Sequence, residues 1–287
     1  MEIRGEVTLE ERKTIMLNLL EILMDYCCKH NLRVYLCGGT LLGAVRHGGF
    51  IPWDDDLDVI MPMEDYDKLM ELAETDKLPE PYHFSTPKNN PYHIFPYIKM
   101  IDHRTVLVED VITRRHRKHQ EAYFGVYIDI FPMYGLPETK ADRLKFQQEM
   151  CVTYRKLKKA TRVMNRRPTD SWFVYMIRRI LYFIYCIPNK LMGHRYYLRK
   201  LDKLKHRYPL DKAEKFGSAT GITTGEKDHN DTSAMKETAF LKFENLNCPV
   251  LPSYHTMLKN QYGDYMKLPP EDQRHTHMSR VFWRKPL

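Results

Sequence analysis

Residues 37–61 read CGGTLLGAVRHGGFIPWDDDLDVIM, and this stretch decides the fold expected for the chain. A short apolar run ends at Cys37, a glycine pair follows it, and a short helix is expected at about 40–46. A second glycine pair and a proline then lead into three consecutive aspartates. Two glycines directly after a strand permit a tight turn and a close approach of ligand to backbone. The stretch therefore predicts a strand, a turn, a short helix and a second strand.

The aspartates at the end of this stretch are the candidate catalytic and metal-binding groups. The second strand is expected over about 56–61, and residues two apart in a strand face the same side, so Asp56 and Asp58 are expected to project together. Asp129 lies in a second β-prone run, 125–131, where an unpaired carboxylate would be costly. Three carboxylates on adjacent strands can hold two magnesium ions, for which manganese can substitute.

Two other interpretations compete with this metal site. A run such as Asp54–Asp56 is often only a solvated acidic turn. Asp102, which follows a predicted strand at 97–101, competes with Asp129 for the place of the third carboxylate. The glycine turn upstream and the apolar surroundings of Asp129 favour the metal site.

Phosphate-binding candidates precede the aspartates. The backbone N–H groups of Gly38 and Gly39 and the hydroxyl of Thr40 are suited to cradle phosphate oxygens. Arg46, after the short helix, is expected either to pair with phosphate or to form a structural ion pair.

Three further side chains are candidates for substrate binding. Trp53, or one of the tyrosines, is suited to stack on a cytosine or to face a quaternary ammonium group. Lys99 alternates with apolar residues on a predicted strand, so it points either into the same cleft or to solvent. His275 could assist proton transfer near neutral pH, with a surface role as the alternative.

The rest of the chain is expected to form an α/β or α+β fold with an appended, mostly helical region. A capping box at Thr8 predicts a helix over 9–30, and strands and short helices alternate up to about residue 137. Long helices are then expected at 140–163 and 172–187. We expect a catalytic core at 1–137, a helical region at 138–235 and a C-terminal segment, 236–287, that returns to the core.

Basic residues are concentrated in the middle region. Nineteen of the 45 Lys and Arg residues lie between Glu138 and Arg207, with only five of the 37 acidic residues. Such a segment suits nucleic acid, an anionic membrane surface or an anionic substrate. The aromatic run at 172–187 is too short to span a bilayer, so it is expected either to lie at a membrane interface or to pack on the core.

Composition limits the location of the protein. The first twelve residues are polar and lack the apolar segment of a secretory signal, which predicts a cytoplasmic protein. The six cysteines form no C-x-x-C pair, so free thiols are expected in place of a zinc site or a disulfide framework.

Several blocks of this sequence resemble the LicD family of bacterial phosphorylcholine transferases, which is related to fukutin and fukutin-related protein. The blocks are Gly39–His47, Gly49–Asp58, Ile128–Pro132, Tyr262–Met266, Leu268–Pro270 and Arg274-His275. The first two blocks are specific to the family, whereas the region from about residue 140 to residue 235 matches the family poorly. Cys37-Gly38 departs from the family pattern, which often has a polar residue before its Gly-Thr.

The resemblance implies a nucleotidyltransferase-like mixed sheet and a magnesium-dependent transferase for substituted phosphate groups. The donor would be CDP-choline or another CDP-alcohol, and CMP would leave. The acceptor would be a sugar hydroxyl of a cell-surface glycan precursor of the teichoic acid or lipopolysaccharide type, carried on a lipid at the inner face of the plasma membrane. By matching positions, Asp56 and Asp58 would be the metal-binding pair and Asp129 the third carboxylate.

Two rival functions stay open on the residues alone. A nucleotidyltransferase would use the same carboxylates to transfer a nucleoside monophosphate and release pyrophosphate. A non-catalytic nucleic-acid-binding protein would use the basic region and bind in a strongly salt-dependent manner. The second rival leaves Asp129 unexplained, so no nucleic acid partner is expected.

Overall fold

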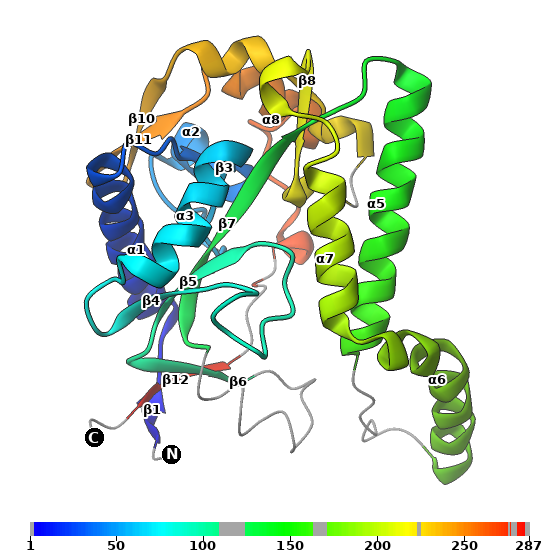
Figure 1. The fold of residues 1–287 in the computed structure, drawn as a ribbon. Coiled ribbons are helices and arrows are strands. Elements are labelled where there is room, and N and C mark those ends of the chain that lie inside the picture. Colours follow the sequence, from blue (N-terminus) through cyan, green and yellow to red (C-terminus); the bar gives the residue numbers. More distant parts are fainter. Residues whose placement is uncertain are drawn as a thin grey trace.

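A computed structural model describes residues 3–108, 124–162, 171–222, 225–274, 276 and 280–284. Its centre is a mixed sheet of seven strands built around β7, Val126–Gly135 (Figure 1). The other strands of this sheet are β2 (Tyr35–Leu36), β3 (Asp58–Pro62), β4 (Tyr82–Ser85), β5 (Ile98–Asp102), β8 (Lys215–Ser218) and β9 (Asn230–Asp231). The expected α/β mixed fold is confirmed.

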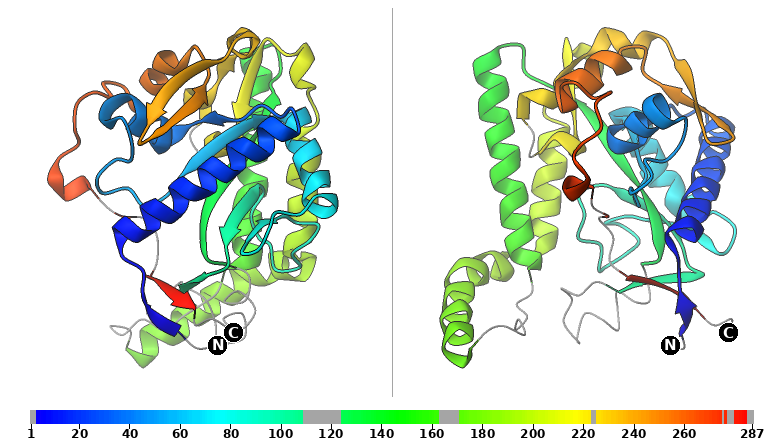
Figure 2. Two further views of the ribbon diagram at one scale, coloured as in Figure 1. Left: turned by 90° about the vertical axis from the view of Figure 1, so that its left-hand side faces the viewer. Right: turned by 180° about the vertical axis from the view of Figure 1, so that it is seen from behind.

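Strand β7 is central because nearly all of its side chains are apolar and buried, which requires cover on both faces. On one edge it pairs in parallel with β3, and on the other it pairs antiparallel with β5 and then with β8. Helix α1 (Leu9–Lys29) lies on one side of the sheet, and helices α5 (Lys140–Thr161) and α7 (His194–Lys205) lie on the other (Figure 2).

The predicted capping box begins α1. The Thr8 hydroxyl accepts the N–H of Glu11, whose carboxylate in turn accepts the N–H of Thr8. The remaining α-helices of the described residues are α2 (Gly38–His47), α3 (Met63–Thr75), α6 (Trp172–Met192) and α8 (Tyr254–Tyr262). The 3-10 helices are η1 (Leu210–Lys212), η2 (Ala219–Ile222), η3 (Gly225–Asp228), η4 (Thr232–Lys236) and η5 (Glu271–Gln273).

The two ends of the chain meet in a small antiparallel sheet. Strand β12 (Arg280–Arg284) lies between β1 (Ile3–Glu6) and β6 (Thr105–Val108), so both termini are at the same end of the molecule (Figure 1). Upstream, β10 (Ala239–Phe243) and β11 (Leu246–Val250) form a hairpin, and α8 packs on α2. The C-terminal residues therefore contact elements formed by the first hundred residues.

Two predicted boundaries are wrong in ways that affect the site. Helix α2 begins at Gly38 and not at residue 40, so both glycines belong to its first turn. Strand β3 begins at Asp58, so Asp56 lies in the loop before the strand and is not its same-face neighbour within it. The run of three aspartates favours an irregular turn over an extended strand, because Asp disfavours the pleated conformation.

Helix α6 extends to Met192, five residues beyond its predicted end, with Pro188 inside it. Most of its large apolar side chains are exposed, and Cys186 is the one buried residue among those described in the helix. The run therefore contributes little to the buried core, although α6 packs against α5 and α7. Within the described ranges, no helix is long and apolar enough to cross a membrane. All six cysteines are free, as expected, although Cys28 is exposed.

Gly43 in α2 allows the chain after the helix to return close against it. A Cβ at this position would lie 2.4 Å from the carbonyl oxygen of Gly49 and 3.3 Å from the nitrogen of Ile51. We expect Gly43→Ala to lower the free energy of unfolding by about 1–3 kcal/mol, because backbone must shift to admit the methyl group. Urea denaturation measures the effect. Gly5→Ala is the matched control, since nothing lies within 4 Å of a Cβ there; equal stabilities of the two variants would contradict the prediction.

Candidate active site

The strand register places three charged side chains in a row across the sheet. Asp58 on β3 is the direct partner of Asp129 on β7, which is the direct partner of Lys99 on β5. Neighbouring strands lie about 4.8 Å apart, so the two carboxylates are close together. The Lys99 ammonium lies 2.5 Å from Oδ1 of Asp129, and the Lys99 side chain is 1% exposed. Lys99 thus points into the site, one of the two predicted alternatives.

The row carries more negative than positive charge. Burial raises the pKa of Asp58 well above its ordinary value, and the charges of Asp56 and Asp129 raise it further, against the opposing effect of Lys99. Burial also raises the pKa of Asp129, and the Lys99 ammonium offsets only part of that increase. One ammonium group therefore serves several crowded carboxylates, and a second cation would relieve the repulsion.

Carboxylate oxygens of this kind fit a magnesium ion. Magnesium takes hard oxygen ligands and is usually held by one or two carboxylates together with substrate phosphates. In the part of the chain that the structure describes, no group of three or more Asp, Glu, His or Cys side chains is arranged to hold a metal ion. Asp129 is paired with Lys99, so Asp56 and Asp58 would be the first ligands of such an ion, and the predicted set of Asp56, Asp58 and Asp129 stays a prediction.

The first turn of α2 faces these carboxylates. Cys37 gives this helix no side-chain cap, and the first N–H groups of any helix lack partners within it, which makes such a terminus suited to bind phosphate. A Cβ at Gly38 would lie 3.6 Å from Oδ2 of Asp58, and one at Gly39 would lie 2.9 Å from Oδ2 of Asp54. The Thr40 hydroxyl accepts the N–H of Asp58 at 2.8 Å, so it ties α2 to β3.

A cavity of about 300 Å³ adjoins Asp58 and the two glycines. Its lining comes from the loop before β5 and from β7, α5, η2 and α8, as well as from α2 and β3. The lining residues are Gly38, Gly39, Asp58, Pro96, Tyr97, Phe131, Tyr154, Ala219, Thr220, Ile222, Gln261 and Tyr262. Segments more than 200 residues apart in the sequence therefore form one site.

Arg46 and Trp53 are not among the residues that line this cavity. Arg46 donates from Nη1 to the carbonyl oxygen of Tyr265 at 3.0 Å and from Nε to Nε2 of His47 at 3.0 Å. The guanidinium of Arg274 lies 4.9 Å from the ring centroid of Trp53. Arg46 and Trp53 therefore belong to a neighbouring cluster that also contains His47 and Arg274. His275, another predicted substrate-binding residue, lies outside the described residues.

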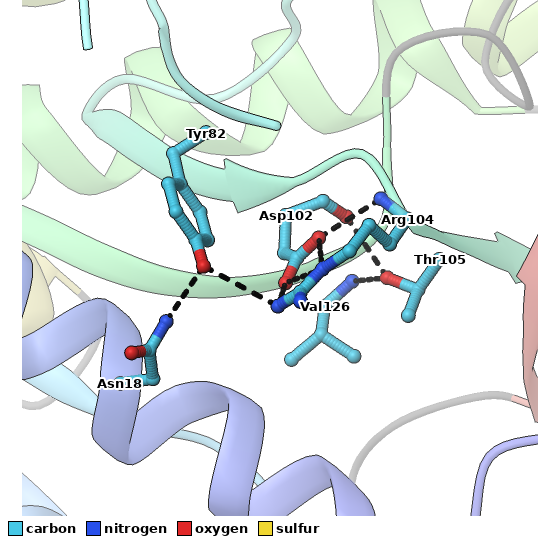
Figure 3. Close-up of polar contacts among 6 residues, drawn as sticks. All are labelled: Asn18, Tyr82, Asp102, Arg104, Thr105 and Val126. Carbon is cyan, nitrogen blue, oxygen red and sulfur yellow. Dashed lines mark hydrogen bonds and ion pairs between the residues drawn. The ribbon is translucent and has the colours of Figure 1, made fainter. Parts of the chain in front are cut away.

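Asp102 lies at the far end of β5 and has a structural role (Figure 3). It is fully buried, accepts the backbone N–H of Arg104 at 2.9 Å and pairs with the guanidinium of the same residue at 2.5 Å. Three residues along a strand correspond to about 10 Å, which separates Asp102 from Lys99 and the carboxylate row. Asp55 likewise forms an ion pair, with 3.2 Å between its Oδ2 and Nη1 of Arg12. Neither carboxylate serves as the third member of the site.

The sequence did not single out several residues of the site. Tyr262 belongs to one of the quoted blocks, and burial together with the charge of Asp58 raises the pKa of its hydroxyl. Asp228 accepts the N–H of Ser218 at 2.7 Å and so fixes the backbone just before η2, which lines the cavity. Burial raises the pKa of the Asp228 carboxyl group to about 7. Thr220 lines the cavity but carries no sequence signal, because only the tertiary fold brings η2 to β3.

Comparison with known proteins finds a family match that covers the glycine turn and the carboxylate row of this site. Residues 31–166 match the family described as LicD/FKTN/FKRP, nucleotidyltransferase domain. The chain is 27% identical to the lipopolysaccharide cholinephosphotransferase LicD of Haemophilus influenzae, over 96% of this chain and 98% of that protein. It is 43% identical to a Rickettsia typhi protein over 20% of this chain and 19% of that protein. It is also 56% identical to the human ribitol 5-phosphate transferase FKRP, over 12% of this chain and 7% of FKRP.

The crowding of carboxylates predicts that Asp58 destabilises the metal-free protein. Its folded-state pKa is raised, so its protonated form favours the folded state and this stabilisation is lost as the pH rises through the raised pKa. At neutral pH without metal, we expect Asp58→Asn to raise Tm by about 2–4 °C. Magnesium should raise Tm of the wild type more than that of the variant. Differential scanning fluorimetry measures both effects, with the exposed Asp211→Asn as control; an unchanged or lower Tm for Asp58→Asn would contradict the account.

Proposed function

Because this chain belongs to the LicD family, we propose that it is a magnesium-dependent transferase of phosphocholine, or a related phospho-alcohol. The donor is a CDP-alcohol, the acceptor is a sugar hydroxyl of a cell-surface glycan precursor, and CMP is released. The observation that carries the proposal is the row of Asp58, Asp129 and Lys99 facing the first turn of α2. The H. influenzae relative is by its name a cholinephosphotransferase that acts on lipopolysaccharide.

The proposed reaction is a displacement at phosphorus. The acceptor hydroxyl oxygen bonds to the phosphorus that carries the alcohol, the bond from that phosphorus to the bridging oxygen breaks, and CMP leaves with the electron pair. A bound magnesium ion would neutralise the diphosphate and stabilise the leaving phosphate. The N–H groups of Gly38 and Gly39 bind phosphate oxygens, and the crowded carboxylates take up the hydroxyl proton on its way to solvent.

Lys99 and Thr40 position the carboxylates for this reaction. The ammonium of Lys99 lies within 4.3 Å of the ring centroids of Phe95 and Tyr127, which holds it against Asp129. Thr40 fixes the backbone of Asp58 relative to α2. Positioning supplies much of the catalysis in phosphoryl transfer, so small displacements here should lower the rate.

The basic middle region supports an acceptor at an anionic membrane surface. Helix α6 exposes an apolar face, with Arg179 and Lys190 also exposed on the same helix. The apolar face consists of Trp172, Phe173, Val174, Ile177, Ile180, Leu181, Phe183, Ile184, Tyr185, Leu191 and Met192. A helix with such a face and nearby positive charge suits the boundary between lipid headgroups and acyl chains. We place the protein at the inner face of the plasma membrane, where it would meet a lipid-linked glycan.

Product analysis tests the proposed activity. We expect CMP release from a CDP-alcohol, with CDP-choline, CDP-ribitol and CDP-glycerol compared in the presence of magnesium and a glycan acceptor. Asp58→Asn should lower the rate at least about 100-fold, because a metal ligand and a charged neighbour of the phosphate are lost. Asp211→Asn should keep the wild-type rate. Pyrophosphate released from a nucleoside triphosphate, with every CDP-alcohol inert, would refute this function in favour of nucleotidyl transfer.

Vesicle binding tests the role of α6. The wild-type protein should sediment with vesicles that contain anionic phospholipid, and the double variant Ile180→Glu, Ile184→Glu should lose most of that binding, because charges cannot enter the acyl region. Phe240→Glu, an equally exposed apolar position on β10, is the control and should bind normally. Equal binding by all three proteins would show that α6 is not the membrane contact.

A further inference from the structure

The cavity beside Asp58 has an aromatic wall as well as a phosphate-binding part. Tyr97, Phe131 and Tyr154 line it, from the residue before β5, from β7 and from α5 respectively. The ring centroids of Tyr97 and Phe131 are 4.3 Å apart, with an angle of 54° between the rings. Rings tilted in this way can present both faces and edges to one small ligand. Tyr97 also forms a side-chain hydrogen bond that stabilises ionised Asp129, whereas the carboxylate chemistry does not require Phe131 or Tyr154.

Negative charge next to these rings favours a cation as their ligand. The faces of aromatic rings attract positive charge. Burial raises the pKa of the Tyr97 hydroxyl well above the ordinary value, and the nearby negative charges of Asp129 and Asp58 raise it further. A neutral pyrimidine would gain from stacking alone, whereas a permanent cation gains from the rings and from the carboxylates.

The neighbouring lysine shows that this region holds a cation against aromatic rings. The ammonium of Lys99 lies 3.3 Å from the ring centroid of Tyr127 and 5.3 Å from that of Tyr97. Its charge is paired with Asp129. The 300 Å³ volume is at the lower end for ligand pockets, which suits a phosphorylated small alcohol better than a complete nucleotide.

We propose that Tyr97, Phe131 and Tyr154 bind the quaternary ammonium group of the donor alcohol and so select choline over uncharged alcohols. This assignment rests on the proposed transferase function. The phosphate of the phosphocholine moiety lies at Gly38 and Gly39, and the trimethylammonium group lies against the three rings. A polyol in the same place would press hydroxyl groups against aromatic carbon and lose their hydrogen bonds to water.

Tyr154 is the residue at which to test the assignment. It is half-buried on α5, whereas Phe131 is 7% exposed and Tyr97 adjoins the carboxylate row. Tyr154→Leu removes the aromatic ring but keeps an apolar side chain, and Tyr154→Phe keeps the ring. CMP release is measured with CDP-choline and with the CDP ester of 3,3-dimethylbutanol, in which carbon replaces the charged nitrogen. Calorimetry measures binding of phosphocholine and of 3,3-dimethylbutyl phosphate to the same proteins in magnesium.

The wild type should prefer the charged donor and the charged phosphate ester about tenfold or more. Tyr154→Leu should lower CMP release from CDP-choline and the affinity for phosphocholine about tenfold each. The same two quantities should change less than about twofold for the uncharged dimethylbutyl compounds. Tyr154→Phe should behave as wild type. Equal losses for charged and uncharged compounds would overturn the assignment, as would no preference in the wild type. CMP release from CDP-ribitol or CDP-glycerol alone would overturn it and leave the transferase intact. If no CDP-alcohol released CMP, the transferase would fail, and the phosphocholine calorimetry would still decide the binding site.

Discussion

The parallel register of β3 and β7 is the constraint on which the site depends. It sets Asp58 directly beside Asp129, and the antiparallel register of β5 adds Lys99 on the other side. Two adjacent carboxylates, of which Asp129 is buried and Asp58 partly buried, cannot both ionise cheaply next to one ammonium group, so the fold stores unfavourable charge at this point. Hydrophobic burial along β7 supplies the compensating stability, since the strand is covered on both faces.

The remaining elements bring donor-binding groups to that charge. Helix α2 directs its uncapped first turn at the carboxylates, and Thr40 holds it there. Helix α5 contributes Tyr154, η2 contributes Thr220, and α8 closes the cavity with Tyr262. In the proposed function, this one cavity would receive the donor phosphate, a metal ion and the small organic cation. The exposed face of α6 is separate from this chemistry and suits a role in placing the enzyme near its acceptor.

Local sequence patterns predicted the sheet, α1 and the central carboxylates because these features depend on neighbouring residues. The apolar run around Asp129 is visible in the sequence, as is the capping box at Thr8. The ion pair of Asp129 with Lys99 was not predictable, because it depends on the register of two strands about 30 residues apart. For Arg46 the sequence left open a phosphate contact or a structural ion pair, and only the fold shows that it donates to the carbonyl oxygen of Tyr265 near the C-terminus. The division into three regions and the roles of individual site residues stay predictions.

A crystal structure of the protein with magnesium and CDP-choline tests the central claim most directly. The account predicts the diphosphate at the N-terminus of α2, the metal ion against Asp58, and the trimethylammonium group against Tyr154. A diphosphate bound at Arg46 and Arg274 instead, with the cavity beside Asp58 filled only by water, would contradict it.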